Sequence, residues 1–255
     1  MSKLSHKHKF IDLSDYGRPI ANIIAQQLKT TNITPVHLTL MFLLSGLIAI
    51  YCIIVSNYWT AAFFLILKSI LDAADGQLAR AKDQPSYTGR YLDSIFDAFL
   101  NLALMLCIGL LTHSSVLLIL LAFLCMQTQG TIYNYYHVIL RHRTDGESTS
   151  QISEAIMPKA YPGESQATVN FLFFLFRFLY RGFDDLVYRL DPFAEQASSS
   201  KKWFMTLVSV YGLGFQLLLI SFFLVMGMID LIIPFFISYS ILIPFIIGIR
   251  RLLLK

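Results

Sequence analysis

Apolar runs of helix length, separated by short polar turns, extend over most of the chain. They cover roughly residues 36–55, 59–72, 88–112, 115–140, 203–228 and 230–249. An α-helix needs about 20 residues to cross the hydrocarbon core of a bilayer, and the runs are near that length. Thr34 and Pro35 are typical of a helix start, with a capping hydroxyl followed by proline at the first helical position. The pattern predicts an all-α, polytopic membrane protein with six transmembrane helices.

A shorter segment before the first run is amphipathic. Its apolar and polar residues fall on opposite faces of a helix: Ile20, Ile23, Ile24 and Leu28 against Asn22, Gln26 and Lys29. This spacing predicts a helix along the membrane surface, with a helix packed on other protein segments as the alternative. We divide the chain into two parts. Residues 1–33 are a basic tail (1–13, expected to be mobile) with this juxtamembrane helix, and residues 34–255 are the membrane-embedded domain.

An insert at residues 142–202 separates the fourth run from the fifth. Its first part is polar, and its second part contains the aromatic sequence NFLFFLFRFLYRGF. Six apolar residues in a row precede Arg177, and three more separate it from Arg181, which is too few to cross a bilayer. We therefore expect the insert to be cytoplasmic or interfacial rather than spanning.

Composition and charge placement agree with a membrane protein and suggest its orientation. Hydrophobic residues make up 56% of the chain and charged residues 14%, against roughly 25% charged residues in soluble domains. Apart from Lys68, every lysine and arginine falls in the N-terminal region, the turn at 80–90, residues 141–202 or the C-terminal end. Because cytoplasmic connections carry an excess of these residues, both termini are expected to face the cytoplasm.

Four aspartates stand where the second run ends and the third begins. Asp72 and Asp75 are three residues apart, and Asp93 and Asp97 are four apart, so each pair shares one face of a helix. The connection between the pairs contains Pro85 and a glycine, which allow the chain to turn back. The two helices would then present four carboxylates to a common space.

Four converging carboxylates would carry a charge of about −4, which cannot stay unpaired beside lipid. Lys68, Arg80 and Arg90 could offset part of this charge. Two divalent cations could offset all of it, and oxygen ligands favour Mg²⁺, Mn²⁺ or Ca²⁺. Acids in spans can also form an ion or proton path, or be solvated at helix ends. Four acids at this spacing favour a two-metal site of the kind used in phosphoryl transfer.

The residues between the aspartates suggest a diphosphate ligand. Gly76 and Ala79 are small and allow close approach to the backbone, while Arg80 offers a planar fork that suits phosphate oxygens. The whole stretch resembles the signature of the CDP-alcohol phosphotransferases (CDP-alcohol phosphatidyltransferases): Asp72-x-x-Asp75-Gly76-x-x-Ala79-Arg80, eight residues, Gly89-x-x-x-Asp93-x-x-x-Asp97. The resemblance covers about residues 14–140, and the insert has no counterpart in it.

The resemblance implies an activity and a role for each aspartate. Members of the family transfer a substituted phosphate group from a CDP-linked donor to an alcohol acceptor and release CMP, in phospholipid synthesis. Asp72 and Asp93 would bridge two divalent cations, Mg²⁺ or Mn²⁺. Asp75 would bind one ion and Asp97 the other. Asp97 would also be the catalytic base that takes the hydroxyl proton of the acceptor.

Four further residues would bind the donor. Gly76, Arg80 and Ser86 would contact the CDP portion, with Arg80 and Ser86 near the diphosphate, and Thr39 would face the cytidine. The family often has a polar residue after the proline at the head of the first span, where this chain has Val36. The acceptor-binding residues, the acceptor itself and the choice between CDP-diacylglycerol and a CDP-linked small alcohol are left open.

The expected partners are the CDP-linked donor, the alcohol acceptor, membrane lipid and, by the resemblance, a second copy in a homodimer, with no nucleic acid. The expected location is the cell (inner) membrane, with the site facing the cytoplasm. Two other functions compete. Intramembrane prenyltransferases also bind magnesium-diphosphate through aspartates, but usually use an Asn-Asp-x-x-Asp motif without the Gly-x-x-Ala-Arg continuation. A cation transporter would place polar residues deeper in several runs.

Several other polar residues are ambiguous. The end of the fourth run is expected to form an aromatic and basic belt at the membrane boundary: Tyr133, Tyr135, Tyr136, His137, Arg141 and Arg143. Arg141 or Arg143 could instead bind an anionic acceptor or a lipid head group. His37 is expected at the membrane interface rather than on a metal. Asn101 could line the same pocket as Asp97 or bond a neighbouring helix.

Overall fold

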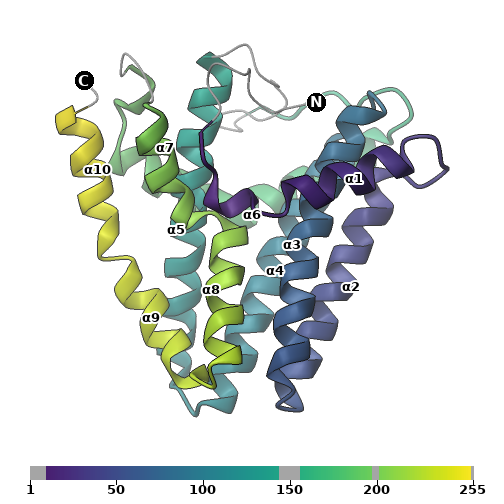
Figure 1. The fold of residues 1–255 in the computed structure, drawn as a ribbon. Coiled ribbons are helices and arrows are strands. Elements are labelled where there is room, and N and C mark those ends of the chain that lie inside the picture. Colours follow the sequence, from purple (N-terminus) through teal and green to yellow (C-terminus); the bar gives the residue numbers. More distant parts are fainter. Residues whose placement is uncertain (1–9, 144–155, 197–200, 254–255) are drawn as a thin grey trace.

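The computed structural model describes residues 10–143, 156–196 and 201–253, whose regular elements are all helical (Figure 1). The α-helices are α1 (Arg18–Leu28), α2 (Pro35–Ile54), α3 (Tyr58–Ala81), α4 (Tyr87–Leu111), α5 (Val116–Arg143), α6 (Gln166–Leu190), α7 (Lys202–Val208), α8 (Leu213–Val225), α9 (Ile232–Tyr239) and α10 (Leu242–Leu253). The predicted all-α class is confirmed. α2 to α5 run side by side along the bundle, and α1 crosses one end of it.

Short polar connections start and stop the long helices. Asn57 caps α3 by accepting a hydrogen bond from the Thr60 N–H at 3.4 Å, and Ser86 caps α4 by accepting one from the Gly89 N–H at 2.8 Å. Asp83, after the end of α3, adopts a left-handed conformation with φ of 52°, which reverses the chain toward Ser86. Residues 82–86 therefore form the turn that brings the two aspartate pairs together.

The start of α2 assigns a role to His37. The ring Nδ1 of His37 accepts a hydrogen bond from the Thr34 N–H at 3.0 Å, so the histidine completes the cap of its own helix. Pro35 occupies the first turn of this helix, as the sequence predicted.

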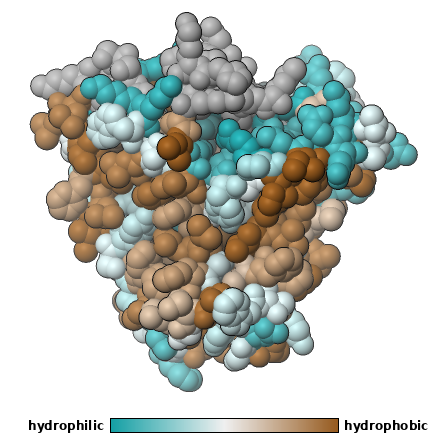
Figure 2. Space-filling view, in the orientation of Figure 1, coloured by the Kyte–Doolittle hydropathy of each residue, from teal (hydrophilic) through white to brown (hydrophobic). Residues whose placement is uncertain are grey.

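Apolar helices identify a polytopic membrane protein. Within the described ranges, four stretches are long and apolar enough to cross a bilayer, namely α2, α4, α5 and Ile229–Leu253, and α7 with α8 gives a fifth if counted as one broken span. α3 falls outside this group because Lys68, Asp72 and Asp75 lie within it. Hydrophobic side chains cover most of the body of the molecule, and hydrophilic ones gather toward its two ends (Figure 2).

The fifth apolar run is not the continuous helix that the sequence predicted. Its two halves, Lys202–Tyr211 and Leu213–Val225, are bent by 51° relative to each other. The N-terminal segment packs into the break: the Gly214 N–H donates to Ser14 Oγ at 3.1 Å, and the Leu13 N–H donates to Ser209 Oγ at 3.0 Å. Residues 10–13 of the expected mobile tail are thus held in place, while residues 1–9 lie outside the described residues.

The amphipathic segment forms α1, which has both a face packed on other helices and an exposed apolar face, the two alternatives that the sequence left open. Its buried residues are Ala21 and Ala25, which pack with α2 and α3 residues such as Leu38 and Leu71. Ile20 and Ile23 are more than half exposed. Small residues allow α1 to approach the bundle closely, and the isoleucines are left to meet lipid.

The second half of the insert forms α6, which packs against α4 and α5. Its buried face joins Tyr91 and Ile95 of α4 in one apolar cluster through Val169, Leu172, Phe173 and Phe176. Phe174 and Phe178 remain exposed. α6 is not among the described helices that are apolar enough to span a membrane.

The aromatic end of α5 points inward, contrary to the expected membrane belt. Tyr135 and Tyr136 are buried and donate from their hydroxyl groups to Asp191, at 3.0 Å to its backbone oxygen and 2.8 Å to its carboxylate. Arg250 of α10 donates to the same carboxylate through Nε at 2.6 Å. The belt prediction was wrong for Tyr135 and Tyr136, because these side chains bind a buried acid between α5, the segment after α6, and α10.

Candidate active site

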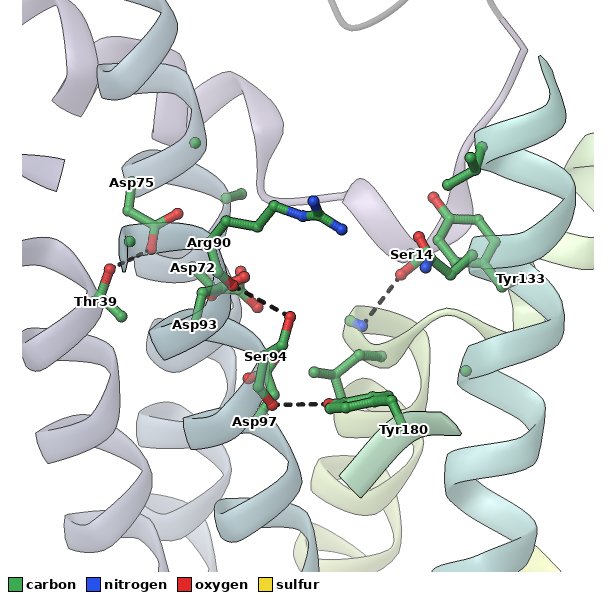
Figure 3. Close-up of a pocket in the computed structure, with 18 of the residues that line it drawn as sticks. Ser14, Thr39, Asp72, Asp75, Arg90, Asp93, Ser94, Asp97, Tyr133 and Tyr180 are labelled. Carbon is green, nitrogen blue, oxygen red and sulfur yellow. Dashed lines mark hydrogen bonds between the residues drawn. The ribbon is translucent and has the colours of Figure 1, made fainter. Parts of the chain in front are cut away.

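A cavity of about 450 Å³ lies among α2, α3, α4, α5, α6, α8 and the segment around Ser14. Every predicted site residue lines it: Thr39, Asp72, Asp75, Gly76, Arg80, Ser86, Asp93 and Asp97. In Figure 3, Thr39 and the aspartates stand on one side of the cavity, and Ser14 and Tyr133 stand on the other. The volume is in the range of pockets that enclose small molecules and cofactors.

Three of the four aspartates converge closely enough to hold one metal ion. Asp72 and Asp75 come from α3 and Asp93 from α4, and one carboxylate oxygen of each lies within 4.8 Å of the others. Asp93 Oδ1 is buried and has no hydrogen-bond partner within the described part of the chain. A buried carboxylate oxygen without a partner is costly unless a cation satisfies it. The donor set fits a hard divalent cation such as Mg²⁺ or Mn²⁺.

The carboxylate of Asp75 is positioned by α2. Thr39 Oγ1 donates to Asp75 Oδ2 at 2.7 Å, and both residues are buried. Thr39 was predicted to face the cytidine, and the structure adds this contact to the metal-binding group. A hydrogen bond of this kind fixes the orientation of a metal ligand.

The fourth aspartate, Asp97, lies beside a buried lysine. Lys68 is 1% exposed, and its ammonium group contacts Asp97 Oδ1 and, at 3.3 Å, Asp72 Oδ2. The sequence identified Lys68 only as one of three partial counter-charges. The four-residue spacing on α3 predicts that Lys68 lies next to Asp72, but its contact with Asp97 depends on how α2, which packs against both helices, places α3 relative to α4.

The residues predicted to bind the donor, Gly76, Arg80 and Ser86, line the same cavity. A Cβ atom on Gly76 would lie 3.4 Å from the guanidinium of Arg80, so the arginine side chain lies along the helix next to the glycine. The Ser86 hydroxyl donates to Glu164 Oε1 at 2.8 Å. The Thr88 N–H donates to the same carboxylate oxygen at 2.7 Å.

Glu164 is a residue of the site region that the sequence did not reveal. It precedes α6 in the insert, and no motif marks it. Burial raises the pKa of its carboxyl group, but hydrogen bonds from Thr88, Ser86 and Tyr161 outweigh burial and leave the pKa below its usual value. The ring of Tyr161 stacks on Tyr87 with centroids 4.9 Å apart. The insert is thereby fixed to the start of α4.

The remaining wall is formed by residues from four segments. Asn101 fits both of its interpretations, since it lines the cavity and donates to Gln127 Oε1 of α5 at 3.2 Å. Arg141 lines the cavity, whereas Arg143 donates to the backbone oxygen of Ala194 at 3.3 Å. Sequence patterns gave no signal for the lining residues from the N-terminal segment and from α6: Ser14, Asp15, Phe176, Tyr180 and Asp184.

Comparison with known proteins assigns the family. The archaetidylinositol phosphate synthase of Pyrococcus horikoshii is 36% identical to this chain over 87 residues, which are 34% of this chain and 46% of that protein. The match therefore spans about half the length of that relative. Residues 32–180 match the family model of the CDP-alcohol phosphatidyltransferases, which takes in every predicted site residue. The match confirms the resemblance of the aspartate motif, and the chain belongs to the CDP-alcohol phosphatidyltransferase family.

Proposed function

We propose that this protein transfers a substituted phosphate group from a CDP-linked donor to an alcohol acceptor, with release of CMP, in phospholipid synthesis. The observation that carries the proposal is the convergence of Asp72, Asp75 and Asp93 in one cavity with Arg80. This arrangement offers oxygen ligands for divalent cations next to a guanidinium group that can bind a diphosphate. Membership of the family supports the same chemistry.

The aspartates would hold two divalent cations in the loaded enzyme. Asp72 and Asp93 would be shared between the ions, Asp75 would bind one and Asp97 the other. When bound, such ions neutralise charge on a diphosphate and on the departing phosphate. Thr39 keeps the Asp75 carboxylate oriented toward this position through its hydrogen bond.

The residues around the cations would position the two substrates. Arg80 would bind the diphosphate, Gly76 would leave room for it, and Thr39 would lie on the cytidine side. Ser86 would face the diphosphate at the start of α4, where its hydroxyl orientation is set by Glu164. Asp97 would take the proton from the acceptor hydroxyl as the oxygen attacks the β-phosphorus and CMP leaves.

We also propose six spans with both termini in the cytoplasm of the cell membrane, and a homodimer. Two features support the topology. α1 and the C-terminal end of α10 lie at the same end of the bundle in Figure 1. α3 has the length of a span and packs along α2, although its charged residues lower its hydropathy. The homodimer rests on the family resemblance alone.

The test of the activity is CMP release. Purified protein would be supplied with radiolabelled CDP-diacylglycerol and a panel of acceptors, and the lipid product would be identified. The panel should contain glycerol phosphate, serine, inositol, a lipid alcohol and, because the Pyrococcus relative is named for such a product, inositol phosphate. EDTA should stop the reaction, and Mg²⁺ or Mn²⁺ should restore it. Turnover that persists in EDTA, or no CMP from any CDP-linked donor, would contradict the proposal.

Replacement of the proposed base separates chemistry from binding. We expect Asp97→Asn to lower CMP release by about 10²-fold or more, because general-base catalysis contributes at least that much, while donor binding persists. Asp185→Asn is the control: Asp185 is an exposed residue of α6 that pairs with Arg181 at 3.7 Å. Near-normal CMP release by Asp97→Asn would remove Asp97 from the reaction.

A further inference from the structure

Lys68 places a fixed positive charge inside the acidic site. It lies on α3 one turn before Asp72, and its side chain is 2% exposed. A buried ammonium group is stable only when it is paired, and that of Lys68 contacts Asp97 Oδ1 and Asp72 Oδ2. It also lies 4.8 Å from the ring centroid of Phe42 on α2. Three helices therefore hold the lysine head in one position.

This lysine divides the four carboxylates into two halves. Oxygens of Asp72, Asp75 and Asp93 converge within 4.8 Å, and Asp93 Oδ1 has no hydrogen-bond partner among the described residues. Asp97 is outside this group and has the ammonium group as its neighbour. Asp72 belongs to both halves, since Oδ2 faces Lys68 at 3.3 Å. The group of Asp72, Asp75 and Asp93 is suited to bind a metal cation, whereas the group of Asp72 and Asp97 already has the Lys68 ammonium group as its cation.

We propose that Lys68 is a built-in cation that occupies the Asp72–Asp97 half of the site. The donor-free protein then binds a single divalent cation, at Asp72, Asp75 and Asp93. The second cation binds only together with a nucleotide diphosphate. This inference rests on the proposed function and deepens it, because it states the order in which the site is loaded.

Charge balance gives the physical reason. A divalent ion beside Asp97 would meet the Lys68 ammonium at close range, where two like charges repel strongly because the lysine is buried. In addition, Asp97 Oδ1 and Asp72 Oδ2 already accept hydrogen bonds from the Lys68 ammonium group, and a cation would have to share these oxygens with it. An incoming diphosphate adds negative charge and new oxygen ligands, and both changes favour a second cation. Lys68 thus couples metal binding to donor binding.

The experiment counts bound Mn²⁺ in the absence of turnover. The full-length protein in detergent would be titrated with Mn²⁺, with free ion measured by electron paramagnetic resonance, with and without CDP as the soluble probe. Wild type should bind one ion per chain without CDP and two with it. Lys68→Met should bind two ions without CDP, with the second at least about tenfold tighter than in wild type. Lys68→Arg, which keeps the charge, should bind one.

The outcomes separate this inference from the proposed function. Two equally tight ions on wild type without CDP would overturn the role of Lys68 and leave the metal-dependent reaction standing. A single ion on folded Lys68→Met would do the same. No saturable Mn²⁺ binding by any variant, even with CDP, would overturn the proposed site as a whole. If Lys68→Met does not fold, the wild-type titrations with and without CDP still decide the question.

Discussion

The carboxylates of Asp75 and Asp97 are each oriented by a residue of a neighbouring helix. Thr39 of α2 donates to Asp75 at 2.7 Å, and Lys68 of α3 pairs with Asp97 of α4. Because partners of metal ligands set ligand orientation, such contacts affect metal affinity strongly. At the scale of single residues, the chemistry of the motif therefore depends on side chains outside the motif.

Thr39 is the residue for which this dependence can be measured. Thr39→Val keeps the shape of the side chain but removes the hydrogen bond to Asp75. We expect the Mg²⁺ concentration for half-maximal activity to rise about tenfold, whereas the KM for the donor at saturating Mg²⁺ changes little. Thr39→Ser should restore the metal response. A raised donor KM with an unchanged Mg²⁺ requirement would instead show that Thr39 acts only on the cytidine.

The sequence alone predicts the pairing of the four aspartates, but it does not predict the contact between Lys68 and Asp97. Helical periodicity alone puts Asp72 with Asp75, and Asp93 with Asp97, on shared faces. The contact between Lys68 and Asp97 depends on how α3 and α4 are placed relative to each other. Both helices pack against α2, as where Leu100 of α4 meets the place that a Cβ on Gly46 of α2 would occupy. Periodicity within one helix carries no such information.

At the scale of elements, the break between α7 and α8 and the segment before α6 complete the cavity. Each was missed from the sequence for its own reason. The run 203–228 contains no charged residue and no proline, so its hydropathy predicts one continuous span rather than a bend at Gly212. The insert lacks a recognisable motif, so its contact with Ser86 through Glu164 could not be inferred. The helices themselves were predictable, because their apolar length is encoded locally.

The close approach of the N-terminal segment to α8 can be tested at Gly214. A Cβ atom at this position would overlap the backbone oxygen of Ser14, which cannot move without displacing the segment. We expect Gly214→Ala to destabilise the protein by about 1–3 kcal/mol, as overpacking does. Gly248→Ala is the matched control, because a Cβ there meets no atom within 4 Å. Equal melting temperatures for the two variants in detergent would contradict this packing.

The contact of Glu164 with the start of α4 should make stability depend on pH. Its pKa is lowered in the folded protein, so it stabilises the fold at pH above its usual value of 4.5, and the contribution is lost as pH falls through the folded pKa. At pH 7 we expect Glu164→Gln to melt roughly 2–4 °C below wild type. The difference should shrink as the pH is lowered below 4.5.

Glu195→Gln, at an exposed acid after α6, provides the control for this pH series. It should follow the wild-type melting curve at each pH, since a replacement on the surface away from specific contacts changes stability little. A difference between Glu164→Gln and wild type that stays constant from pH 7 to acid pH would show that the charge of Glu164 is not responsible.

At the scale of the whole molecule, the cavity lies where polar and apolar surroundings meet. The ends of α3 and α4 that carry the aspartates lie near the end of the bundle where α1 crosses, and apolar side chains cover the body below (Figures 1 and 2). A CDP-linked lipid needs both environments, because its nucleotide is soluble in water and its tails are not. Which side of the membrane this end faces is set by the positive charges around it.

Cysteine labelling in intact cells tests that orientation. In a chain whose native Cys52, Cys107 and Cys125 are replaced, one cysteine would be placed in the turn between α3 and α4 by Gln84→Cys. A second variant, Ser115→Cys, marks the turn between α4 and α5 at the opposite end of α4. We expect a membrane-impermeant maleimide to label Ser115→Cys from outside, and Gln84→Cys only after the cells are permeabilised. The reverse labelling would put the cavity on the outer face, away from the cytoplasmic supply of CDP-linked donors, and would contradict both the orientation and the proposed reaction.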